Sequence, residues 1–103
     1  ICAYLADAFP EANLAPPTAG RGSYYRWMFF AAGPVESAVT NKALGFEMPE
    51  GRERMAGYGT FDQAIDALEQ AVSGPGWICG DQFTAADVYV GAQIDWGLSF
   101  RSI

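Results

Sequence analysis

Apolar residues recur three and four positions apart along most of the chain, and no segment shows the alternating pattern of a β-strand. The longest stripe predicts a helix from about residue 18–22 to residue 43–45. Its members are Tyr24, Trp27, Met28, Ala31, Val35 and Ala38. A second stripe, through Tyr58, Phe61, Ile65, Leu68 and Val72, predicts a helix over about 52–72. With a short apolar helical stretch over 1–8, the fold class is predicted to be all-α.

A proline interrupts the longest predicted helix. Pro34 lacks a backbone N–H, and its ring clashes with the carbonyl four residues earlier. We therefore expect a kink near residues 30–33, or, as the alternative, a break into two helices. A loop with Pro49 should follow, and the Gly74-Pro75-Gly76 sequence should end the second helix.

Thr84 and Asp87 stand three residues apart, just before an apolar run, as in a capping box. The Thr84 hydroxyl can accept from the Asp87 amide, and the Asp87 carboxylate can accept from the Thr84 amide. The predicted helix runs from residue 85 to about 98. Because Asp87 and Asp95 are its only charges, we expect it to be buried at the centre of the bundle. Structural capping is the preferred role of Thr84 and Asp87.

The charge and the residue types present exclude several function classes. The net charge is −6, whereas nucleic-acid-binding domains are normally basic, so no nucleic-acid partner is expected. No apolar run is long enough to span a membrane. We also expect no membrane partner for the chain. The absence of histidine excludes Ser-His-Asp and Cys-His catalysis within this chain. Cys2 and Cys79 do not have the spacing of a metal site, so we expect no metal and a pair of reduced thiols, although their number would permit a disulfide.

The segment from Trp77 to Tyr89 resembles the buried-helix motif of the cytosolic glutathione transferases, especially bacterial, beta-class-like members. The shared pattern is an aromatic residue, a glycine turn, an apolar residue, Ser/Thr-x-Ala-Asp and an apolar helix. The resemblance implies the family's C-terminal helical domain over residues 18–103, truncated before its last helices. It also implies that residues 1–10 are a remnant of the last helix of a thioredoxin-like domain, joined by a linker over 11–17.

The same resemblance implies candidate site residues. Trp96 matches a position that lines the pocket for the electrophile, and Tyr24, Met28 and Ala32 lie where the family's helix faces the cleft between domains. Core packing is the alternative for each of them. Glu36 stands where beta-class enzymes often carry a histidine, and we expect it to be a solvent or interface residue. No residue of this chain is expected to be catalytic.

Two function classes follow. The first is a cytoplasmic, homodimeric glutathione transferase, an enzyme that joins the glutathione thiolate to a small apolar electrophile. This chain would supply the apolar substrate wall and a dimer surface, and would be inactive alone, since glutathione would be bound mainly by the other domain. The second is a non-catalytic module of the same fold that serves protein interaction or assembly.

Overall fold

The computed structural model describes all 103 residues, and its regular structure is helical. The α-helices are α1 (Cys2–Ala8), α2 (Gly22–Phe30), α3 (Glu36–Ala43), α4 (Phe61–Val72) and α5 (Ala85–Ser99). Short 3-10 helices cover Pro10–Ala12, Thr18–Gly20 and Glu53–Met55. The one β-type contact is an isolated bridge between Trp77 and Gly80. The predicted all-α fold class is confirmed.

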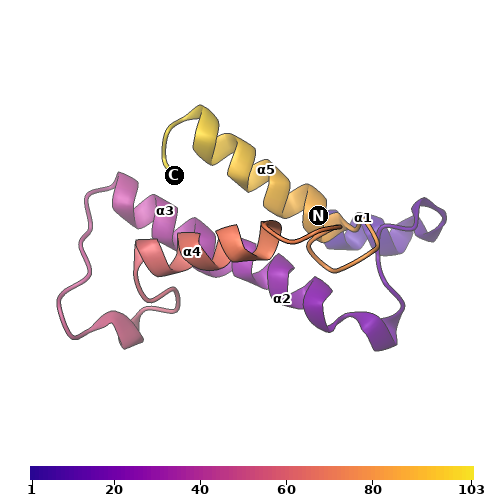
Figure 1. Ribbon diagram of the computed structural model, residues 1–103, viewed down its shortest axis with the longest axis horizontal. Coiled ribbons are helices and arrows are strands. Elements are labelled where there is room, and N and C mark those ends of the chain that lie inside the picture. The colour runs from indigo at the N-terminus through magenta and orange to yellow at the C-terminus, as the bar shows by residue number, and fades with distance from the viewer.

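The segments α2 and α3 form one uninterrupted rod through a π-helical turn, Ala31–Val35, which contains Pro34 (Figure 1). The residues at its junctions keep right-handed helical angles; Phe30 has φ −60° and ψ −42°, and Glu36 has φ −60° and ψ −46°. A π turn adds a residue to the helical repeat, and this accommodates the proline without ending the helix. The predicted position of the irregularity is correct, and the alternative of two separate helices is wrong.

The predicted start of α4 at residue 52 is wrong, because α4 begins at Phe61. Gly59 has φ +72°, which an α-helix cannot include, so the chain turns there. Thr60 then caps the helix: its hydroxyl accepts from the Gln63 amide at 3.2 Å, while the Gln63 side chain accepts from the Thr60 amide at 3.1 Å. The apolar stripe of the sequence also extends to residues before α4. In the structure, that preceding segment contains only the short helix Glu53–Met55.

The core lies where α2 and its π turn cross the first half of α5. Small residues of α5 (Ala85, Ala86) allow close approach, and Val90 completes that face. Opposite them lie the buried members of the predicted stripe, Tyr24, Trp27, Ala31 and Val35. Leu68 from α4 and Ala6 from α1 close the cluster.

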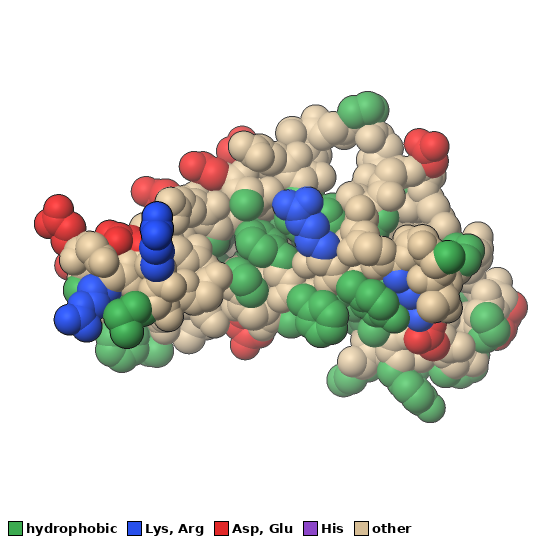
Figure 2. Space-filling view, turned by 90° about the horizontal axis from the view of Figure 1, so that it is seen from below, with side chains coloured by type: hydrophobic (Ala, Val, Ile, Leu, Met, Phe, Trp, Pro, Cys, Tyr) green, Lys and Arg blue, Asp and Glu red, His purple; other side chains and the backbone are tan.

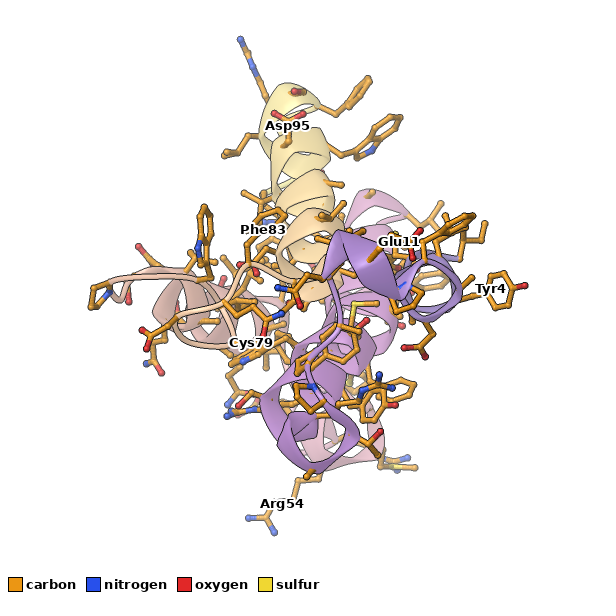
Figure 3. All side chains as sticks on the ribbon, turned by 90° about the vertical axis from the view of Figure 1, so that its right-hand side faces the viewer. Tyr4, Glu11, Arg54, Cys79, Phe83 and Asp95 are labelled. Atoms are coloured by element: carbon orange, nitrogen blue, oxygen red, sulfur yellow. The ribbon has the colours of Figure 1, made fainter.

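The expected burial of α5 holds only for the inner face of its first half, where Ala85, Ala86 and Val90 are buried while Val88 is exposed. Beyond Val90 the helix extends past α1 and α2, and the end that carries Asp95 stands apart from the other helices (Figures 1 and 3). The large apolar residues there are mostly exposed; they are Trp96, Leu98 and Phe100. The expectation of a helix buried all round is therefore wrong, since no element of this structure covers the outer side of that half.

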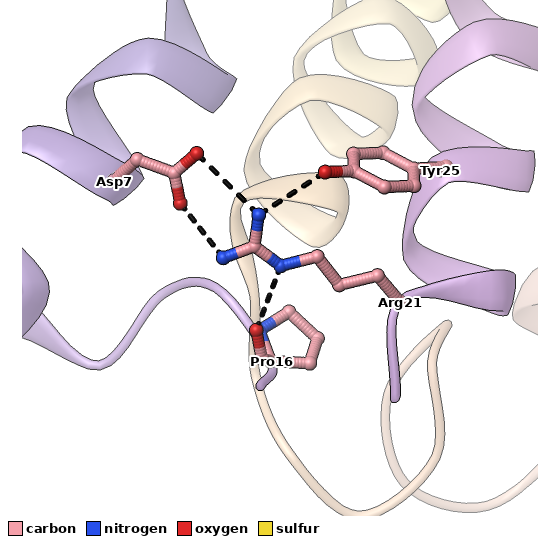
Figure 4. A network of polar contacts seen from close by, with 4 residues as sticks. All are labelled: Asp7, Pro16, Arg21 and Tyr25. Carbon is pink, nitrogen blue, oxygen red and sulfur yellow. Dashed lines mark hydrogen bonds and ion pairs between the residues drawn. The ribbon is translucent and has the colours of Figure 1, made fainter. Parts of the chain in front are cut away.

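An ionic contact fastens α1 to the start of α2. Arg21 donates to the Asp7 carboxylate at 2.8 Å, to the Tyr25 hydroxyl at 3.1 Å and to the Pro16 carbonyl at 2.9 Å (Figure 4). The hydrogen bonds to Tyr25 and Asp7 raise the pKa of Arg21. Arg21 thus joins a helix, the connecting segment and the long rod, which makes the predicted linker part of the folded body. The proposed domain boundaries themselves stay a prediction.

Candidate functional site: the cleft between α3 and α5

A concavity opens between α3 and the second half of α5, and we call it the α3–α5 cleft. It holds about 320 Å³. Its apolar lining consists of Val35, Val39, Leu68, Ala92, Trp96 and Ile103. Its polar lining consists of Glu36, Thr40, Tyr89, Gln93 and Ser102, and Gly97 completes the floor. A mostly apolar hollow with a few polar groups is typical of small-molecule sites.

Helical spacing explains why these side chains meet. Glu36 and Thr40 are four apart on α3, so they share one face of that helix. Tyr89, Gln93 and Trp96 step four and three along α5, and the Gln93 amide donates to the Tyr89 hydroxyl at 3.2 Å. The indole of Trp96 is 65 % exposed and packs on the Phe100 ring, with 4.4 Å between centroids. Trp96 therefore presents a large aromatic surface at the mouth of the cleft.

The last residues of the chain fold back to form one end of the cleft. Arg101 takes a left-handed φ of +56°, the Ser102 amide donates to the Gly97 carbonyl at 2.8 Å, and the Arg101 amide donates to the Leu98 carbonyl at 3.3 Å. This is the hydrogen-bond pattern of a Schellman helix end. Ile103 then lies on Gly97, so closely that a side chain at residue 97 would displace it.

The structure does not bring the four predicted substrate residues together. Trp96 borders the α3–α5 cleft, whereas Tyr24, Met28 and Ala32 lie elsewhere on the long rod and do not line it. Tyr24 is 1 % exposed within the core, where burial raises the pKa of its hydroxyl; Met28 is half-buried and Ala32 is exposed. Any contact between these residues and a substrate stays a prediction.

Sequence reasoning missed most of the cleft. Glu36 is exposed, as expected, but it also borders the cleft, and Thr40, Tyr89 and Gln93 were not singled out. The available signal was their helical spacing relative to Glu36 and Trp96. The part played by Ile103 had no sequence signal, because it depends on the reversal of the chain at Arg101.

The predicted capping box is present at the start of α5. The Thr84 amide donates to Asp87 Oδ2 at 2.9 Å, and the Thr84 hydroxyl accepts from the Ala86 amide at 3.2 Å. Two contacts were not foreseen. Asp87 Oδ1 accepts from the Ile78 amide at 2.9 Å, and the Ala85 amide donates to the Leu14 carbonyl at 2.8 Å. The cap therefore also holds the preceding loop and the segment after α1, which fixes the position of α5.

The thiols and acidic groups offer little further chemistry. Cys2 and Cys79 are free, as expected. Burial raises the pKa of the Cys79 thiol, and a hydrogen bond from Thr84 only partly opposes that effect, so the reactive thiolate is disfavoured. No three Cys, Asp or Glu side chains are grouped so as to hold a metal ion. None of the helices combines the length and the apolar character that a bilayer-spanning segment needs.

Comparison with known proteins identifies the family. No curated protein and no solved structure matched the chain. The family model described as "Glutathione S-transferase, C-terminal domain" matches residues 36–96, which run from α3 through α4 to Trp96 on α5. The match includes the capping box and most of the cleft lining. The chain belongs to the glutathione S-transferase family, as a C-terminal domain of that type.

Proposed function

We propose that this chain is the helical half of a glutathione transferase, and that the α3–α5 cleft is its wall for an apolar electrophile. The observation that carries the proposal is the position of Trp96: it borders an apolar hollow of about 320 Å³ within the segment that matches the family. Aromatic and aliphatic walls suit a non-polar substrate, whose burial contributes roughly 25 cal/mol per Å² of apolar surface.

The proposed reaction is attack of the glutathione thiolate on an electrophilic carbon. A C–S bond forms and the leaving group departs with its electron pair. The enzyme must lower the pKa of the glutathione thiol, and no lysine or arginine lines the cleft to do so. Glu36, the charged residue at the cleft, would raise a neighbouring thiol pKa by charge repulsion. Glutathione binding and thiol activation are therefore assigned to a thioredoxin-like domain outside this chain, and a cytoplasmic homodimer is the proposed working form.

A conjugation assay tests the proposal on the protein that joins this chain to its glutathione-binding half. With glutathione and 1-chloro-2,4-dinitrobenzene, we expect a thioether product and release of chloride. Trp96→Ala should lower kcat/KM roughly tenfold, because it removes most of an aromatic contact surface. Trp77→Ala is the matched control, since Trp77 is also half-exposed but lies in the loop before α5, against Phe83. Equal losses in the two variants would refute the cleft as the substrate wall.

A non-catalytic interaction module is the second candidate, and exposed apolar side chains favour it. Tyr4, Leu5 and Phe9 of the α1 region are exposed, as are Tyr25 and Phe29 of α2. Figure 2 shows hydrophobic side chains in patches on the face seen from below, and Figure 3 shows Tyr4 projecting away from the molecule. Such patches are typical of partner surfaces. Absence of any glutathione-dependent product in the assay would favour this second function.

A further inference from the structure

The charge at the α3–α5 cleft has one sign. Glu36 is the one acidic side chain of the lining, and no lysine or arginine lines the cleft. Arg101 adjoins the lining residue Ser102 in sequence but is exposed and outside the lining. Because the whole chain also carries a net charge of −6, no distant excess of positive charge offsets the Glu36 carboxylate.

The aromatic side chains of the cleft complete a favourable environment for a cation. Trp96 and Tyr89 both line it, and indole and phenol faces attract positive charge. The same interaction occurs elsewhere in the chain, where the Arg26 guanidinium lies 4.4 Å from the Trp27 ring centroid and the Lys42 ammonium 3.8 Å from that of Phe61. In the cleft, by contrast, the lining contains no basic residue that would lie against the Trp96 or Tyr89 ring.

We propose that the α3–α5 cleft selects apolar aromatic ligands that carry a positive charge with N–H donors, and that Glu36 determines this specificity. The inference rests on the proposed function in taking the cleft as the substrate site. It adds the chemical class: an aryl or arylalkyl ammonium compound is preferred to its neutral counterpart, and an anionic counterpart is rejected. The Glu36 carboxylate receives the N–H groups while the apolar walls hold the ring.

Four naphthalene probes test the inference by titration calorimetry on this chain: 1-naphthylmethylammonium, its trimethylammonium derivative, neutral 1-naphthylmethanol and anionic 1-naphthylacetate. The primary ammonium should bind most tightly and the carboxylate most weakly. A charge contact at about 4 Å in water is equivalent to about a fivefold change in Kd. Glu36→Gln, which keeps the size of the side chain, should therefore weaken the primary ammonium about fivefold and leave the neutral alcohol unchanged.

Asp95→Asn is the matched control, because Asp95 precedes the lining residue Trp96 on α5, is exposed and does not line the cleft. It makes the same change in net charge and should leave all four Kd values unchanged. The inference is overturned if Glu36→Gln keeps the preference for the cation, or if Asp95→Asn reduces it equally. Equal binding of the primary and trimethylammonium probes would overturn the role of the N–H donors.

Failure of this inference can be told apart from failure of the proposed function. If 1-naphthylmethanol binds and Trp96→Ala weakens it, the cleft is an apolar site whatever the charge preference. If the neutral probe does not bind at all while the full-length protein turns over an apolar electrophile, the substrate wall lies elsewhere. Circular dichroism of the Glu36→Gln and Asp95→Asn variants would establish that both keep the wild-type helix content.

Discussion

The carboxylate of Asp87 accepts the backbone amide of Ile78 at 2.9 Å, nine residues earlier in the chain, while its other oxygen accepts the Thr84 amide at 2.9 Å. One side chain therefore starts α5 and holds the loop that leads into it. Because the cleft lies further along the same helix, the position of Trp96 depends on this contact.

Replacement of Asp87 should be among the most destabilising changes at the helix ends. Asp87→Ala leaves two backbone amides without their acceptors, and hydrogen bonds to a charged group contribute about 1.5–3 kcal/mol each. Because Asp87 is only half-buried, water can replace part of these bonds, and we expect a loss of about 2–4 kcal/mol in the free energy of unfolding, measured by urea denaturation. Asp95→Ala, on the exposed side of α5, should change it by less than about 0.5 kcal/mol. If Asp87→Ala lowered the free energy of unfolding by as little as the control does, Asp87 would not have this role in holding α5 and the loop before it.

The contact between Arg21 and Asp7 should control how firmly α1 is attached. Arg21→Lys keeps the charge but lacks the planar guanidinium that reaches Asp7, Tyr25 and the Pro16 carbonyl together. We expect faster proteolytic cleavage between α1 and α2 in Arg21→Lys and in Asp7→Asn. Arg54→Lys is the control, because Arg54 lies in the distant short helix Glu53–Met55 and projects away from the molecule (Figure 3). Cleavage at the same rate in all three variants would exclude a fastening role for Arg21.

The hydroxyl of Tyr24 is buried and has no hydrogen-bond partner. Tyr24→Phe removes this uncompensated group and keeps the ring, so the free energy of unfolding should rise by about 1 kcal/mol. Tyr25→Phe is the contrast, because the Tyr25 hydroxyl accepts from Arg21, and it should not stabilise the chain. Thermal or urea denaturation measures both. Destabilisation by Tyr24→Phe would imply that the hydroxyl has a partner or a functional contact.

Alkaline pH should destabilise the fold. Burial raises the pKa of Cys79 above its ordinary value of 9.0 and that of Tyr24 above 10.0, so the folded chain holds these protons more tightly than the unfolded chain. The resulting stabilisation is complete below the unfolded-state pKa values and is lost as the pH rises from there through the folded-state values.

The loss should therefore begin at about pH 8.5–9, where an unfolded cysteine titrates. Cys79→Ala should show a smaller fall in the free energy of unfolding between pH 7 and pH 9.5 than the wild type does, as measured by urea denaturation at each pH. An identical fall in the two proteins would show that the Cys79 thiol does not contribute.

Local sequence signals predicted the elements that depend on neighbouring residues. The Thr84/Asp87 spacing correctly located the start of α5, and Pro34 correctly located the irregularity in the rod. The start of α4 was predicted wrongly, because an apolar stripe was followed past Gly59 although Thr60 and Gln63 carry a capping-box pattern. The capping-box pattern and the left-handed Gly59 turn before it decide where α4 begins, and the apolar stripe does not.

The cleft was less predictable, because it depends on how far separate helices overlap. An apolar helix predicts burial, yet Trp96 is exposed because α5 extends beyond the helices that cover its first half. The family resemblance suggested that Tyr24, Met28 and Ala32 face the cleft between domains, whereas the packing of α2 against α5 places Tyr24 in the core. Only the arrangement in space shows that Glu36 and Trp96 border one hollow.

The central claim is that the α3–α5 cleft receives an apolar ligand, and a nuclear magnetic resonance titration of this chain tests it most directly. Amide and indole N–H shifts are followed as neutral 1-naphthylmethanol is added. The account predicts saturable shifts of the Trp96 indole and of the Thr40 and Ala92 amides, with the Trp77 indole unchanged. Shifts centred on Trp77, or no saturable shift at Trp96, would contradict it.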